Sequence, residues 1–134
     1  MMRVNLVIKL NNARVTGAKL PPIMSRLHDL CRADPTIRIL DEVLSYVDVQ
    51  RLYASCDMFV SLHRSEGLGF GLIESMAHGK PVIATAWSGN IHESHSCLVR
   101  YKLIPVEGNL AVYKNDALSE VATWDDSDLD HVAS

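Results

Sequence analysis

Two carboxylates, Glu66 and Glu74, stand eight positions apart on either side of a glycine-rich stretch. Three alternating glycines lie between them: Gly67, Gly69 and Gly71. Apolar runs at 58–62 and 81–85 flank the stretch, so the order predicts a strand, a glycine loop, a short helix and a second strand. A glycine loop that leads into a helix presents free backbone N–H groups at the positive end of the helix dipole, where phosphate binds readily. The motif therefore predicts an anion-binding turn with two carboxylates close to it.

The longer string around this pair resembles the donor-binding half of the group 1 glycosyltransferases, retaining enzymes of the GT-B fold that are similar to glycogen synthases. Glu66 and Glu74 keep the spacing of the two signature glutamates, and residues 78–85 continue the signature. Two shorter strings that accompany it in a bacterial subset are also present, Ser-Leu-His-Arg at 61–64 and Ser-Gly-Asn at 88–90. A lone glycine loop would be weak support, whereas the combined string is specific.

The resemblance implies a role for each acid. Glu74 would accept hydrogen bonds from the ribose hydroxyls of a nucleotide sugar, because a carboxylate can bind two vicinal hydroxyls. Glu66 is the expected catalytic residue, either binding sugar hydroxyls or stabilising positive charge at the anomeric carbon. The alternatives are a solvated helix glutamate for Glu74 and a favourable interaction with the helix dipole for Glu66.

The expected donor-binding residues surround the glycine loop and the next strand end: Arg64, Gly67, Leu68, Gly69, Phe70, Glu74, Ser88, Gly89 and Asn90. The amides of Gly69 and Phe70 are the candidate phosphate contacts, and Arg64 is either a further phosphate donor or a surface arginine. Gly71 departs from the family pattern and costs the helix about 1 kcal/mol of propensity. The residues after Asn90 also depart from the subset, which affects recognition of the sugar.

Composition excludes several other classes of protein. The chain has 134 residues and a net charge of −3, with no basic cluster that would suggest nucleic acid as a partner. It has no apolar run long enough for a transmembrane segment and no visible signal peptide, so we expect a cytoplasmic protein, or one peripheral to the membrane. Its three cysteines suggest neither disulfides nor a zinc site. The resemblance implies a metal-independent protein with no cofactor, whose nucleotide sugar is a substrate.

Strands alternate with helices along the first 105 residues. Strands are expected at 4–10, 37–40, 58–62, 81–85 and 97–100, and helices at 24–31, 49–54 and 70–77. This order predicts an α/β fold with a Rossmann-like parallel sheet, in which ligands lie beyond the carboxyl ends of the strands. We expect residues 1–105 to form a partial nucleotide-sugar-binding domain and residues 106–134 to form its irregular acidic tail.

The resemblance also implies parts that this chain does not contain. The expected sheet is the C-terminal half of a GT-B enzyme lacking its first strand, which would lie between the strands at 4–10 and 58–62. The acceptor would be held by an N-terminal domain, either on another chain or missing. The expected function is therefore donor binding for retaining glycosyl transfer. The alternatives are a non-catalytic remnant or binding module with weak nucleotide affinity and, less favoured, a nucleotide-sugar epimerase.

Overall fold

The structure is a computed structural model that describes residues 4–10, 22–64, 66–87, 96–105 and 123–132. The chain divides into two compact units, Met1–Tyr46 and Val47–Ser134. Both units contain strands paired in parallel with helices between them. The predicted mixed α/β class with parallel strand pairing is confirmed.

The first unit contains two parallel strands and one helix. Strand β1 (Leu6–Leu10) pairs with β2 (Ile37–Asp41) along its full length. Helix α1 (Pro22–Ala33) connects them and packs against β2. It begins at a proline, whose fixed φ and missing N–H suit the first helical position, and it is longer than the predicted 24–31. After the helix, the Thr36 amide and hydroxyl donate to Asp34, which lowers the pKa of that carboxyl.

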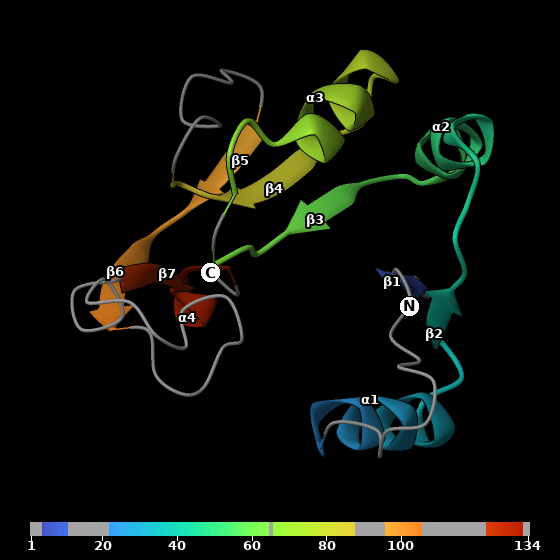
Figure 1. The fold of residues 1–134 in the computed structure, drawn as a ribbon, viewed down its shortest axis with the longest axis horizontal. Helices are drawn as coiled ribbons and strands as arrows, with labels where there is room; N and C mark the ends of the chain where they lie inside the picture. Colours follow the sequence, from blue (N-terminus) through green and yellow to red (C-terminus); the bar gives the residue numbers. More distant parts are fainter. Residues whose placement is uncertain (1–3, 11–21, 65, 88–95, 106–122, 133–134) are drawn as a thin grey trace, which may run out of the picture. The chain divides into compact units, whose positions relative to one another are not determined.

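The second unit is built on a three-stranded parallel sheet (Figure 1). Its strands lie in the order β3 (Phe59–Ser61), β4 (Val82–Thr85) and β5 (Ser96–Val99). Helix α3 (Phe70–Ala77) connects β3 to β4 and packs against both. The strands and helix predicted around the glycine loop are therefore present. Among the described strands β1 pairs with β2 and not with β3.

The core of the second unit lies between α3 and the central strand. Leu72 of α3 and Val82 and Ala84 of β4 are almost fully buried, and Phe59 and Met76 pack against them. Alternate residues of β4 face this core because successive side chains of a strand point to opposite faces. The core therefore fixes the helix directly above the strand that follows it.

Helix α2 (Tyr46–Ser55) begins earlier than the sequence predicts. We expected Asp48 to cap a helix over 49–54, but Asp48 lies inside the first turn and pairs with Arg51 at 2.9 Å. Ser45 directly precedes the helix and is of a type favoured at N-caps. The error arose because both Ser45 and Asp48 are good capping residues by type.

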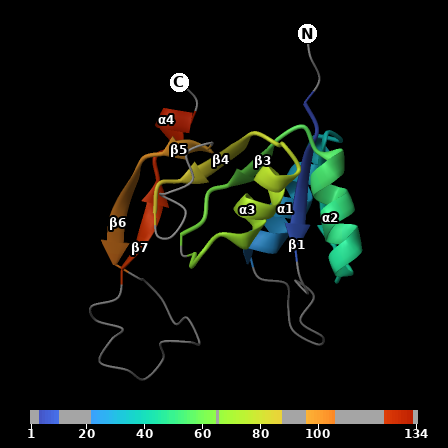
Figure 2. The ribbon, with the colours of Figure 1, turned by 90° about the horizontal axis from the view of Figure 1, so that it is seen from above.

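The end of the chain contains a hairpin that the sequence analysis did not predict. Strand β6 (Tyr101–Pro105) pairs antiparallel with β7 (Thr123–Ser127), and the short helix α4 (Leu129–Val132) follows (Figure 2). The expectation of an irregular tail from 106 onward is thus wrong for residues 123–132, while residues 106–122 lie outside the described residues. The cause is that β7 is rich in aspartate and lacks a strong apolar alternation, so its pairing with a distant strand defines it.

Among the described helices, none has both the length and the apolar character needed to cross a bilayer.

Candidate functional site

The site begins at the turn between β3 and α3. Gly69 is the N-cap of α3 and has left-handed backbone angles, φ 69° and ψ 48°. Its carbonyl accepts the first helical hydrogen bonds, from the amides of Leu72 at 2.8 Å and Ile73 at 3.1 Å. An L-residue would be strained in this conformation, which explains the glycine at this position. The amides of Phe70 and Gly71 precede the first N–H that can bond within the helix.

A carboxylate oxygen of Glu66 lies at this turn. Its Oε1 atom accepts hydrogen bonds from the Gly67 amide at 3.0 Å and the Gly69 amide at 3.2 Å. The two amides therefore converge on a single anionic oxygen, whereas the sequence analysis named the amides of Gly69 and Phe70 as the candidate phosphate contacts. The Glu66 side chain is exposed to solvent. A phosphate oxygen that took the same amides would displace this carboxylate.

Glu74 lies in the second turn of α3 and is partly buried. Tyr53 of α2 is its electrostatic neighbour. Burial of the hydroxyl raises the pKa of Tyr53, and the negative charge of Glu74 raises it further. Tyr53 in turn contacts Phe59 of β3 edge to face, with ring centroids 5.6 Å apart. Glu74 is thus held beside an aromatic pair that connects α2 to β3.

Gly71 has a structural role that the sequence analysis missed. A Cβ atom at this position would lie 3.2 Å from the Tyr53 hydroxyl oxygen and 3.3 Å from Cζ of Phe59. Both distances are tighter than ordinary packing contacts. The glycine that departs from the family pattern therefore lets the aromatic pair approach the first turn of α3, which offsets its cost in helix propensity.

Helix α3 ends in a motif that returns the chain to the sheet. The Gly79 amide donates to the Met76 carbonyl at 2.8 Å, and the Lys80 amide donates to the Ser75 carbonyl at 3.1 Å. Gly79 has φ 70°, so it takes the left-handed position of a Schellman cap. Ser75 is fully buried and bonds the Gly71 carbonyl at 2.7 Å. Both ends of the helix are consequently fixed.

Arg64 lies between β3 and the glycine turn and forms an ion pair. Its Nη2 atom is 2.8 Å from Oδ1 of Asp126 in β7, and both side chains are about half exposed. The sequence analysis left Arg64 as a phosphate donor or a surface arginine. The structure places its half-exposed guanidinium beside a carboxylate from a strand 62 positions later.

Hydrogen bonds between hydroxyls connect β7 to the loop that carries Arg64. Thr85 is fully buried at the end of β4, and its hydroxyl donates to the His63 carbonyl at 3.0 Å. The Ser127 hydroxyl lies 2.9 Å from the same Thr85 oxygen. Because Thr85 has one proton to give, Ser127 is the donor of the second bond. His63 Nδ1 lies 3.2 Å from the Ser61 hydroxyl, while its buried Nε2 has no partner among the described residues.

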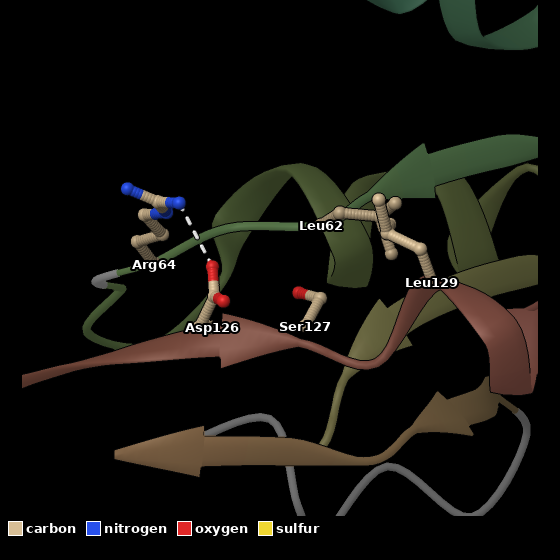
Figure 3. A pocket seen from close by; sticks show the side chains of 5 residues that line it. All are labelled: Leu62, Arg64, Asp126, Ser127 and Leu129. Carbon is tan, nitrogen blue, oxygen red and sulfur yellow. Dashed lines mark hydrogen bonds and ion pairs between the residues drawn. The ribbon is translucent and has the colours of Figure 1, made fainter. Parts of the chain in front are cut away.

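A cavity of about 190 Å³ lies where this loop meets β7 and α4 (Figure 3). Its lining residues are Leu62, Arg64, Asp126, Ser127 and Leu129. In Figure 3 the Arg64–Asp126 pair and the two leucine side chains lie toward opposite ends, with the Ser127 hydroxyl between them. The cavity therefore combines charged, hydroxyl and apolar groups.

The described residues contain no group of three or more potential metal ligands. Asp126, Ser127 and Asp128 do form an Asp-x-Asp sequence, which in principle could bind a cation. Each of these carboxylates faces an arginine, however, because Asp126 pairs with Arg64 at 2.8 Å and Asp128 with Arg100 at 3.6 Å. The arginines supply the positive charge that a cation would otherwise bring.

The structure describes only some of the other predicted donor-binding residues. Leu68 and Phe70 project into solvent from the turn, with 61% and 68% of their surfaces exposed. Ser88, Gly89 and Asn90 lie outside the described residues. The structure thus brings Arg64, Glu66 and the glycine turn onto one loop, with Glu74 on the helix that follows.

The sequence analysis missed four residues that shape this region: Tyr53, Thr85, Asp126 and Ser127. Tyr53 lies within the helix predicted at 49–54, and Thr85 ends the strand predicted at 81–85. The aspartates near the end of the chain were interpreted as an acidic tail.

Comparison with known families supports the assignment made from the motif. A family model described as group 1 glycosyl transferases matches residues 6–115, which is most of the chain. Comparison with curated proteins and with solved structures finds no match. The matched region contains the glycine turn, both glutamates and the strands around them. The chain therefore belongs to the group 1 glycosyltransferases.

Proposed function

We propose that this chain binds the nucleoside diphosphate part of a nucleotide-sugar donor at the turn between β3 and α3. In this arrangement the backbone amides of the glycine turn, at the N-terminus of α3, contact the diphosphate, and Glu74 accepts hydrogen bonds from the ribose hydroxyls. The bound sugar is then transferred with retention to an acceptor on a separate N-terminal domain. This assigns the chain the donor half of a glycosyltransferase.

The single observation that carries the proposal is the convergence of two backbone amides on one anionic oxygen. The Gly67 and Gly69 amides donate to the same Glu66 oxygen, so they are already directed at a common negative charge. A helix N-terminus adds the favourable end of the helix dipole. Family membership supports the same interpretation, because the match spans this turn.

Glu66 is the proposed catalytic residue of this arrangement. A diphosphate on the glycine turn would repel its carboxylate and free it from the two amides. The released carboxylate would then be available to the sugar, where it can bind hydroxyls or stabilise charge at the anomeric carbon. Binding of the donor and placement of the catalytic acid are coupled in this scheme.

The direct test is calorimetry with UDP, GDP and ADP on the Glu74→Ala variant. Loss of a hydrogen bond to a charged group is expected to weaken nucleotide binding by about 1.5–3 kcal/mol. Glu42→Ala is the matched control, because Glu42 is an exposed glutamate outside the motif. Equal affinities of Glu74→Ala and the unmodified chain would refute the ribose role.

We also propose that nucleotide binding needs no divalent metal ion. The phosphate charge would be met by backbone amides, and the Asp126 and Asp128 carboxylates face arginines rather than an open cation site. Nucleotide affinity is therefore expected to be unchanged in EDTA. Binding that disappears in EDTA and returns with added manganese would contradict this.

A further inference from the structure

We propose that the cavity lined by Leu62, Arg64, Asp126, Ser127 and Leu129 is a subsite for one neutral sugar ring. The inference deepens the proposed function and rests on it for the source of the sugar. The ligand chemistry is that of a pyranose: vicinal hydroxyls with an adjoining patch of C–H groups.

The size of the cavity suits one ring. Its volume of about 190 Å³ is many times the roughly 10–15 Å³ that a cavity needs to hold one water molecule. It is smaller than the roughly 300–1,000 Å³ of sites that enclose drug-sized ligands. A whole nucleotide sugar would not fit inside it, whereas a single monosaccharide unit is of the right scale.

The polar groups of the lining suit hydroxyls better than an anion. The Arg64 guanidinium only donates hydrogen bonds and the Asp126 carboxylate only accepts them. A pair of vicinal hydroxyls can satisfy both, because each hydroxyl donates and accepts. A phosphate in the same place would bond Arg64 but meet the negative charge of Asp126, whose carboxylate lies 2.8 Å from the guanidinium.

The apolar groups of the lining suit the face of a sugar ring. Leu62 and Leu129 lie toward the end of the cavity away from the ion pair (Figure 3). Leu129 is 64% exposed, so much apolar surface is open to water in the structure. A ring whose C–H groups cover it would remove that surface from water while its hydroxyls reach the ion pair.

The ion pair is suited to recognition because its contribution to stability is small. Both side chains are about half exposed, and such pairs add little to folding. The strand that carries Asp126 is nevertheless held in place, since Ser127 bonds the buried Thr85 hydroxyl. Arg64 belongs to the loop that also carries Glu66. The subsite is thereby fixed beside the glycine turn.

The experiment is an NMR titration of the full chain with methyl α-D-glucopyranoside and methyl α-D-mannopyranoside, and with UDP, UDP-glucose, GDP and GDP-mannose. We expect the methyl signals of Leu62 and Leu129 to shift with the sugar-containing ligands. Asp126→Asn removes the charged acceptor and should weaken that binding by about tenfold. Asp128→Asn is the matched control, because Asp128 pairs with Arg100 and does not line the cavity.

The arms of this experiment separate the two sources of sugar. If the donor sugar occupies the cavity, Asp126→Asn weakens the binding of the nucleotide sugars and leaves the affinities for UDP and GDP unchanged. If an acceptor sugar occupies the cavity, Asp126→Asn weakens the binding of the methyl glycosides alone. Glycoside binding that depends on Asp126 in a chain that binds no nucleotide would refute the proposed function and leave the subsite intact.

The proposal is overturned if Asp126→Asn and Asp128→Asn bind every ligand alike. It is also overturned if no sugar-containing ligand shifts the Leu62 and Leu129 methyl signals. Leu129→Ala tests the subsite independently if Asp126→Asn fails to fold. Leu129 is exposed, and its truncation leaves the ion pair in place. This second variant should also weaken sugar binding, through the apolar face alone.

Discussion

The two units of this chain are built from the same pattern of strand, helix and strand, yet their packing differs. In the second unit, seven described residues are buried: Gly69, Leu72, Ser75, Val82, Ala84, Thr85 and Val99. In the described part of the first unit no residue reaches that degree of burial. The first unit also exposes several large apolar side chains, among them Val4, Leu6 and Ile23.

The difference follows from the number of strands. In the second unit β4 lies between β3 and β5 and is covered by α3, so its residues have neighbours on both sides. Among the described strands of the first unit, β1 and β2 pair only with each other, so both are edges of their sheet. Two strands rarely form a stable core by themselves, whereas three strands with a covering helix can. The glycine turn is attached to the better-packed unit, which holds its unusual backbone conformation in place.

The largest expected effect comes from opening the core of the second unit. Leu72→Ala should lower its free energy of unfolding by about 2–5 kcal/mol, because it leaves a cavity between α3 and β4. Leu6→Ala, at a half-exposed position of the first unit, should cost less than about 1 kcal/mol. Urea unfolding measures both. Equal losses would show that the two units are packed alike.

A second contrast separates two glycines of the same loop. Gly69→Ala forces an L-residue into left-handed angles and should destabilise the fold by about 1–2 kcal/mol. Gly67→Ala should change stability little, since its φ is not positive and a Cβ there has open space. Thermal unfolding of the two variants provides the comparison. A larger cost for Gly67→Ala would contradict the assigned role of the turn.

The smallest effect concerns the titration of Tyr53. Its pKa is raised first by burial and then by the charge of Glu74, so Glu74→Gln should lower that pKa while leaving it above 10.0. The unfolded chain, with the ordinary value, ionises first as the pH rises, so stability is lost above about pH 10. Ultraviolet titration of the phenolate follows the change. An unchanged pKa in the variant would mean that Glu74 does not face Tyr53.

The shift at Tyr53 also sharpens the contrast between the units. In the first unit the pKa of Asp34 is lowered by Thr36, only two residues away in the chain. In the second unit the pKa of Tyr53 is raised first by burial and then by the charge of Glu74, which lies on another helix. Local hydrogen bonds thus account for the first, and tertiary packing for the second.

The sequence by itself determined the family, the order of strands and helices up to β5, and the glycine turn at Gly69. These features are local: apolar periodicity defines each element, and a left-handed residue at a helix start favours glycine. Even there, the predicted start of α2 was wrong, because Ser45 and Asp48 are both good capping residues. Local pattern identified which residues belong to the loop, but not what each one contacts.

Only the tertiary structure decided how the site is enclosed. It paired Arg64 with Asp126, joined Thr85 to Ser127 and brought Tyr53 against the place where Gly71 has no side chain. Each of these contacts joins residues far apart in the chain. The periodicity of apolar residues along the sequence cannot predict such contacts. Asp126 of β7 illustrates the reason: in the sequence it belongs to a charged tail, and it lines a cavity because β6 supplies a partner strand for β7.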